Sequence, residues 1–72
     1  MNIRQLEVFR AIMRDGTITA AANSLGISQP AVSKLLAYLE DQLGYPLFER
    51  IAGRLVPTTE AHLLYGDADR VF

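Results

Sequence analysis

Residues 17–36 read TITAAANSLGISQPAVSKLL and predict two short helices joined by a tight turn. Gly26 stands where the end of the first helix favours a left-handed residue. Ser28 is a good N-cap for the second helix, and Pro30 lies in its first turn, where a missing N–H costs nothing. Because Pro30 cannot donate, we expect the Ser28 hydroxyl to accept a hydrogen bond from the N–H of Ala31.

Helix signals continue on both sides of this segment. Apolar residues at helical spacing predict a first helix that Asn2 caps and that ends at residues 15–16. Thr17 or Thr19 caps the second helix, and the third is expected over residues 29–43. The buried stripe of the third helix is expected to contain Val32, Leu35 or Leu36, Leu39 and Leu43.

A short two-stranded pattern follows the third helix. Residues 47–50 and 55–56 predict the arms of a β-hairpin, with a turn over residues 51–54 that contains a glycine. Pro57 is expected to stop the second arm.

A last helix is expected after the hairpin. Thr58 or Thr59 caps it, and Gly66 is expected inside it because apolar spacing resumes beyond that residue. Its apolar side is predicted to hold Ala61, Leu64, Ala68 and Phe72 or Val71. The order of three helices, a hairpin and a further helix predicts a mainly α, winged helix-turn-helix fold.

Composition and charge limit the possible classes of protein. The chain has 72 residues, half of them hydrophobic, and contains no cysteine, so we expect one small globular domain without disulfides or zinc–thiolate clusters. No secretory leader or membrane-spanning run is visible, and a cytoplasmic location is expected. The net charge of −1 disfavours nucleic-acid binding by charge alone. The acidic excess lies in residues 60–72, and Lys34 is the only charge within residues 16–39.

Three segments carry a family resemblance: TAAA at 19–22, SQPAVSK at 28–34 and LFER at 47–50. With Leu39-Glu40 between them, they resemble the N-terminal domain of LysR-type transcriptional regulators. Residues 53–58 look most like the branch that contains regulators of lysine biosynthesis and opine catabolism. The resemblance implies a bacterial regulator that binds double-stranded DNA sequence-specifically and is not an enzyme.

The resemblance also implies a much longer protein. Residues 1–58 would form the DNA-binding domain, and residues 59–72 the start of a linker helix, so we expect a truncated chain. Two copies would pair through this helix on a partly palindromic operator, with higher oligomers in the full-length protein. No cofactor is expected in the domain itself, and a small-molecule effector is expected only in the missing C-terminal domain.

Four residues of the second helix of the pair are expected to contact bases, because such helices enter the major groove with their N-terminal end. Gln29 can donate to and accept from adenine, and Pro30 offers an apolar face to a thymine methyl group. Ser33 can reach a base edge or a phosphate, and Lys34 a guanine or a phosphate. Each also has a plainer interpretation as a solvated or helix-initiating residue.

A second group is expected to contact the DNA backbone or to act through the wing: Arg4, Thr17, Thr19, Ser28, Tyr38, Arg50 and Arg54. The three hydroxyls beside helix N-termini are caps first, and phosphate contact would be an addition. The tyrosine can instead lie against the protein. The two wing arginines can reach the backbone or a narrow minor groove, or one of them can pair with Glu49 or another acid.

Two other classes of function are weighed against this one. The net negative charge favours a winged-helix module that binds protein, which a flat salt dependence of binding would support. An enzyme would need titratable groups gathered in a pocket, whereas the acids here are scattered along the chain. His62, the only histidine, has no cysteine or second imidazole for a metal site and no nucleophile at catalytic spacing.

Overall fold

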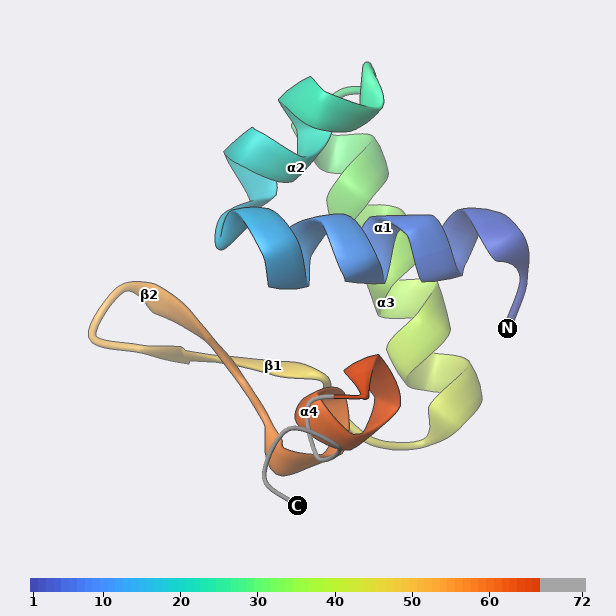
Figure 1. Ribbon diagram of the computed structural model, residues 1–72, viewed down its shortest axis with the longest axis vertical. Coiled ribbons are helices and arrows are strands. Elements are labelled where there is room, and N and C mark those ends of the chain that lie inside the picture. Colours follow the sequence, from blue (N-terminus) through green and yellow to red (C-terminus); the bar gives the residue numbers. More distant parts are fainter. Residues whose placement is uncertain (67–72) are drawn as a thin grey trace.

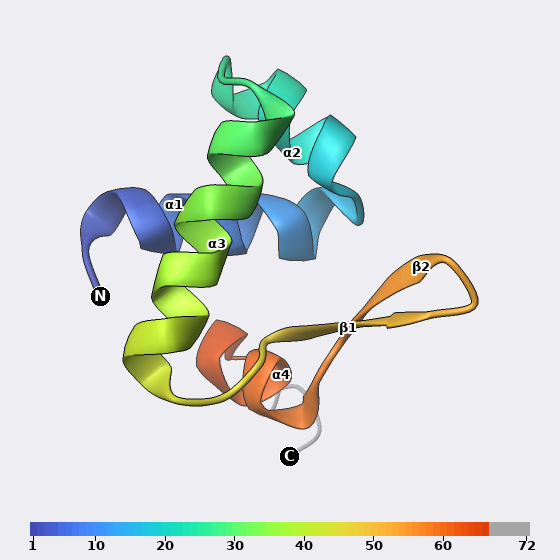
Figure 2. The same ribbon diagram turned by 180° about the vertical axis from the view of Figure 1, so that it is seen from behind.

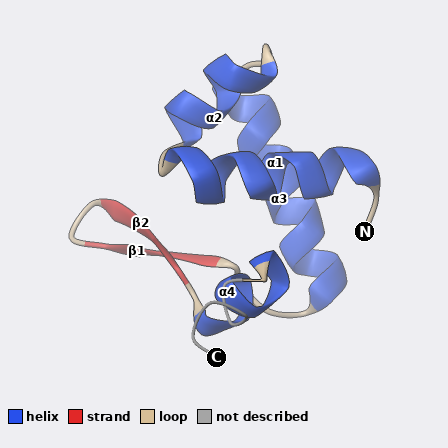
Figure 3. Ribbon diagram, in the orientation of Figure 1, coloured by secondary structure: helices blue, strands red, loops and turns tan. Residues whose placement is uncertain are grey.

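The computed structural model describes residues 1–66 and has the predicted order of elements (Figure 1). They are α1 (Ile3–Asp15), α2 (Ile18–Leu25), α3 (Gln29–Leu43), β1 (Phe48–Ile51), β2 (Arg54–Pro57) and α4 (Thr59–Tyr65). The first three helices pack together, and the antiparallel hairpin extends from them as a wing (Figures 2 and 3). The fold is therefore the winged helix-turn-helix that the sequence predicts.

The predicted helix ends in the helix-turn-helix segment are confirmed. Thr17, rather than Thr19, caps α2 and accepts a hydrogen bond from the N–H of Ala20 at 3.0 Å. The Ser28 hydroxyl accepts the predicted bond from the N–H of Ala31 at 3.2 Å. These caps satisfy backbone donors that the first turn of a helix leaves unpaired, which fixes where each helix begins.

A single apolar core joins the helices to the base of the wing. Its largest fully buried side chains are those of Phe9, Ile12, Leu39, Leu47, Val8 and Val32. The Phe9 ring centroid lies 6.0 Å from that of Phe48 and 6.2 Å from that of Tyr65, which links α1 to β1 and α4. On α3, Leu36 is the buried member of the predicted pair and Leu35 is half-buried.

The hairpin turn is shorter than the four residues predicted for it. Ile51 pairs with Arg54, so only Ala52 and Gly53 remain in the turn, at φ of 54° and 77°. Two successive residues with positive φ form a tight turn that matches the twist of the strands. Pro57, opposite Phe48, ends the second strand as predicted.

The Ala52→Asn substitution is expected to stabilise the chain by about 1 kcal/mol. A non-glycine residue in the left-handed region costs about 1–2 kcal/mol, and asparagine tolerates that region better than alanine does. Urea unfolding of both chains measures the difference. Ala52→Val is the matched control and should destabilise the chain, because β-branched residues avoid positive φ; an equally stable valine variant would contradict the turn geometry.

The last helix ends earlier than predicted. Thr58 caps α4, and its hydroxyl accepts from the N–H of Ala61 at 3.1 Å. Gly66 was expected inside the helix, but that prediction is wrong: its φ is 89°, and its N–H bonds back to the carbonyl of Leu63 at 3.2 Å. A left-handed glycine that satisfies the last carbonyls is a usual helix terminator. The apolar positions expected at Ala68, Val71 and Phe72 lie outside the described residues.

Candidate nucleic-acid interface

The side chains expected to read bases lie together on one open face of α3. Gln29, Pro30, Ser33 and Lys34 are all exposed, whereas Val32 on the opposite face is fully buried. Their spacing in the helix places them along its N-terminal half on the same side. The face therefore offers an amide, a ring, a hydroxyl and an ammonium to a groove that a helix can enter.

Tyr38 extends this face by a further turn. Its side chain is 50% exposed, and the Lys34 ammonium lies 5.8 Å from the centroid of its ring. A cation at this distance from an aromatic ring is attracted by the negative face of the π-system. The ring is therefore held at the surface of α3 beside the ammonium and does not pack into the core.

A hollow of about 360 Å³ joins the start of α2, the start of α3 and the wing. It is lined by Gly16, Thr17, Ile18, Thr19, Gln29, Arg50, Gly53, Arg54 and Leu55. The structure thus brings together five residues that sequence alone could only treat separately, namely the two threonines, the glutamine and both wing arginines. The hollow combines the Gln29 amide with cations and hydroxyls on one surface.

The two wing arginines have no ion-pair partner within residues 1–66. Arg50 lies opposite Leu55 in the hairpin, on the strand face that includes Phe48. Glu49 lies opposite Val56, on the other face, because successive side chains of a strand point in opposite directions. Arg54 lies opposite Ile51, on the same face as Glu49, but no ion pair joins Glu49 to either arginine within residues 1–66. Both arginines are therefore available to an anion.

Arg4 and Ser28 lie outside the hollow. Arg4 is on the first turn of α1, whose N-terminal end is on the side of the molecule away from the wing tip (Figure 1). Its guanidinium forms an exposed ion pair with Glu7 at 3.9 Å. Ser28 is exposed just before α3, where its hydroxyl already caps the helix. Their expected DNA contacts are thus separate from the group around the wing.

Two residues that hold the base of the wing were missed by sequence reasoning. The Glu40 carboxylate accepts hydrogen bonds from the N–H groups of Leu47 at 2.6 Å and Phe48 at 3.3 Å. The Thr58 hydroxyl donates toward the carbonyls of Pro46 and Leu47, at 3.0 and 3.2 Å. The sequence signal for Glu40 was an acidic residue next to the apolar stripe of α3. Its hydrogen-bond partners could not be predicted, because they lie outside α3, at the start of the wing.

A further polar cluster joins the end of α1 to α2. Arg14 donates to Asp15 through Nε at 2.9 Å, and the Ser24 hydroxyl donates to the same carboxylate at 2.9 Å. The hydrogen bond from Arg14, and then that from Ser24, lowers the pKa of Asp15 below its usual value of 3.8. Arg14 is consequently paired within residues 1–66, unlike Arg50 and Arg54.

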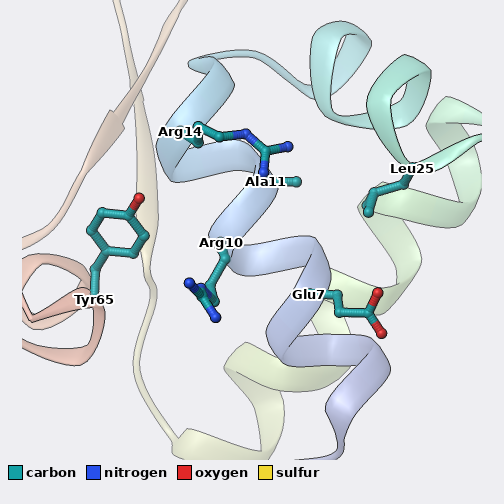
Figure 4. A pocket seen from close by; sticks show the side chains of 6 residues that line it. All are labelled: Glu7, Arg10, Ala11, Arg14, Leu25 and Tyr65. Carbon is teal, nitrogen blue, oxygen red and sulfur yellow. The ribbon is translucent and has the colours of Figure 1, made fainter.

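A second hollow, of about 310 Å³, lies along α1 between α2 and α4 (Figure 4). It is lined by Glu7, Arg10, Ala11, Arg14, Leu25 and Tyr65, none of which was expected to contact DNA. Within residues 1–66, no group of three or more metal-ligating side chains is found. In the same part of the chain, every helix is too short or too polar to traverse a bilayer.

Comparison with known proteins gives one consistent family. The family model described as "Bacterial regulatory helix-turn-helix protein, lysR family" matches residues 3–62. The HTH-type transcriptional regulator DgcR of Pseudoalteromonas sp is 51% identical over 72 residues, which is 100% of this chain and 25% of that protein. The octopine catabolism/uptake operon regulatory protein OccR of Rhizobium meliloti is 44% identical over 100% of this chain and 24% of its own length. The chain therefore spans about a quarter of these curated relatives.

A solved structure shares the whole fold. The crystal structure titled CbnR_DBD-DNA complex superposes with a TM-score of 0.86 at 37% sequence identity. The match covers 99% of this chain and 82% of that one, so the helices and the wing are both included.

Proposed function

The chain belongs to the LysR family of bacterial regulatory helix-turn-helix proteins, and we propose that it binds double-stranded DNA sequence-specifically as part of a transcription regulator. The proposal rests on the hollow that Gln29 lines together with Arg50 and Arg54, two arginines without an ion pair in the described part of the chain. A helix face for base edges and a cationic wing for the flanking backbone are thereby combined on one surface. The CbnR domain, which has the same fold, is titled as a complex with DNA.

Base recognition is assigned to the open face of α3. The Gln29 amide can donate to and accept from adenine, and the Pro30 ring can contact a thymine methyl group. Ser33 and Lys34 continue along the same face toward the next base or phosphate. All four side chains are exposed, so none has to leave the core before the helix enters the major groove.

Backbone recognition is assigned to the α2 terminus and the wing. Arg50 and Arg54 have no ion pair to break within residues 1–66, so they can approach phosphates or a narrow minor groove directly. The Thr17 and Thr19 hydroxyls, with Ser28 and Tyr38, add neutral donors near helix N-termini and along α3. Arg4 can join them because its exposed pair with Glu7 contributes little.

Residues 1–58 are the DNA-binding domain in this proposal, and residues 59–72 begin the segment through which two copies pair. Leu63 is 61% exposed on α4, which leaves an apolar side chain for a partner. Paired copies would read a partly palindromic site. Because the relatives are about four times longer, effector binding and higher oligomers are assigned to the rest of such a protein. The role is one of binding rather than catalysis, in the bacterial cytoplasm.

The Gln29→Ala substitution tests the assignment of base recognition. It should reduce discrimination at one or two base pairs by about 1–3 kcal/mol, because a bidentate contact to adenine is lost. Arg54→Ala should instead weaken binding to all sequences evenly. Competition binding against duplexes with single base-pair changes measures both effects.

Gln42→Ala is the matched control, since Gln42 is exposed at the other end of α3. It should leave the sequence preference unchanged. An unaltered preference in the Gln29→Ala variant would show that α3 does not dock as proposed.

A further inference from the structure

We infer that Glu40 is a positioning residue for DNA recognition: its carboxylate ties the wing to α3, so that base contacts and wing contacts are made by one rigid unit. The inference rests on the proposed function above. It adds a role to a residue that does not itself line the hollow or the open face of α3.

The tie is made where the wing begins. Glu40 Oε2 accepts from the N–H of Leu47 at 2.6 Å and from the N–H of Phe48 at 3.3 Å. Leu47 is 0% exposed and Phe48 is 9% exposed, so these donors lie in a region with little access to water. A buried N–H without a partner is costly, and the carboxylate satisfies two such groups at once.

No second side-chain hydrogen bond of this kind links α3 to the wing strands within the described part of the chain. The Thr58 hydroxyl bonds to Pro46 and Leu47, which closes the base of the wing on itself rather than on α3. Leu39 of α3 also shares the apolar core with Leu47 and Phe48 at the base of the wing, but apolar packing is not directional. Hydrogen bonds to an ionised acceptor are directional and stronger than neutral ones.

The position of Glu40 explains how the tie reaches the DNA-binding face. Its helix, α3, is continuous from Gln29 to Leu43, and the open face is at the other end. A change in the angle between this helix and the wing would move Arg54 relative to Gln29, although both line the same hollow. Without the carboxylate, we expect the wing to lose its fixed angle while α3 keeps its own contacts.

A double-mutant cycle on a bound duplex measures this coupling. In the otherwise unaltered chain, Arg54→Ala should weaken binding about tenfold, the loss of one charge-assisted contact. In a Glu40→Ala background the same change should cost less than about threefold, since the wing no longer holds the arginine in place. The cost of Gln29→Ala should be the same in both backgrounds. Glu40→Gln keeps an acceptor oxygen and should restore part of the Arg54 effect.

Asp41→Asn is the matched control, because it removes a negative charge from the exposed neighbouring residue. In the Asp41→Asn background, Arg54→Ala should still weaken binding by the full factor of about ten. Amide hydrogen exchange in the free chain gives a readout without DNA: the N–H groups of Leu47 and Phe48 should exchange faster in Glu40→Ala than in Asp41→Asn.

A full tenfold cost of Arg54→Ala in the Glu40→Ala background, or unchanged exchange at the two amides, would overturn the inference. If Glu40→Ala does not fold, the Glu40→Gln background is used instead. A full tenfold loss of affinity from Arg54→Ala in that background overturns the inference, and a smaller loss supports it. If neither the unaltered chain nor Asp41→Asn binds any duplex, the proposed function fails, and the role of Glu40 in DNA recognition fails with it. The exchange experiment would then report only on the hydrogen bonds.

Discussion

Raising the salt concentration from about 50 to about 200 mM is expected to weaken DNA binding by paired copies roughly 10³-fold. Lys34, Arg50 and Arg54 have no acidic partner within residues 1–66, and each copy can neutralise phosphates with them. Two copies would release the counterions of about six phosphates, which gives a slope of log K against log salt near roughly −5. Fluorescence anisotropy titrations at several salt concentrations measure this slope.

The slope also separates the proposed function from its main alternative. Arg54→Ala should make the slope shallower by about 1 for each bound copy, because one phosphate contact is lost. Arg10→Ala is the control, since Arg10 is exposed on α1 outside the hollow and should leave the slope unchanged. A flat salt response would favour a winged-helix module that binds protein, the class that the net charge of −1 supports.

The Phe9→Ala substitution is expected to destabilise the chain by about 3–5 kcal/mol. Phe9 is 0% exposed, and its ring packs against those of Phe48 and Tyr65, so its loss opens a cavity between α1, β1 and α4. A core of this size supplies only about 3–5 kcal/mol of net stability. The variant should therefore be largely unfolded at room temperature, as urea titrations followed by circular dichroism would show.

Ile3→Ala is the matched control for this prediction. Ile3 is 78% exposed at the start of α1, so its truncation should change the free energy of unfolding by less than about 0.5 kcal/mol. A Phe9→Ala chain with an unchanged unfolding midpoint would contradict the packing of the core.

The helices were predictable because their ends depend on neighbouring residues. Ser28 and the glycine after α2 act within one turn of the chain, so the sequence is enough to place the helix boundaries. The turn of the wing was predicted at the wrong length because Ala52 adopts a positive φ, and an alanine in the sequence does not indicate that conformation. Gly66 was misplaced because apolar spacing beyond it argued for a continuous helix, whereas its own backbone ends α4.

The candidate site was predictable residue by residue but not as an assembly. The helix-turn-helix pattern alone placed Gln29 and Lys34 on an open face of α3. Gln29 and Arg54 line the same hollow only because of the angle between the wing and α3. That angle is fixed by contacts between residues far apart in the sequence. Glu40 shows the limit most clearly, since its hydrogen-bond partners begin seven residues later, outside α3 and at the start of the wing.

Selection of bound duplexes from a random pool with the 72-residue chain shows whether α3 reads bases. We expect enrichment of a partly palindromic motif, in which the preference at one or two base pairs disappears when Gln29→Ala replaces the unaltered chain. A recovered pool with no sequence enrichment over the starting pool would contradict it.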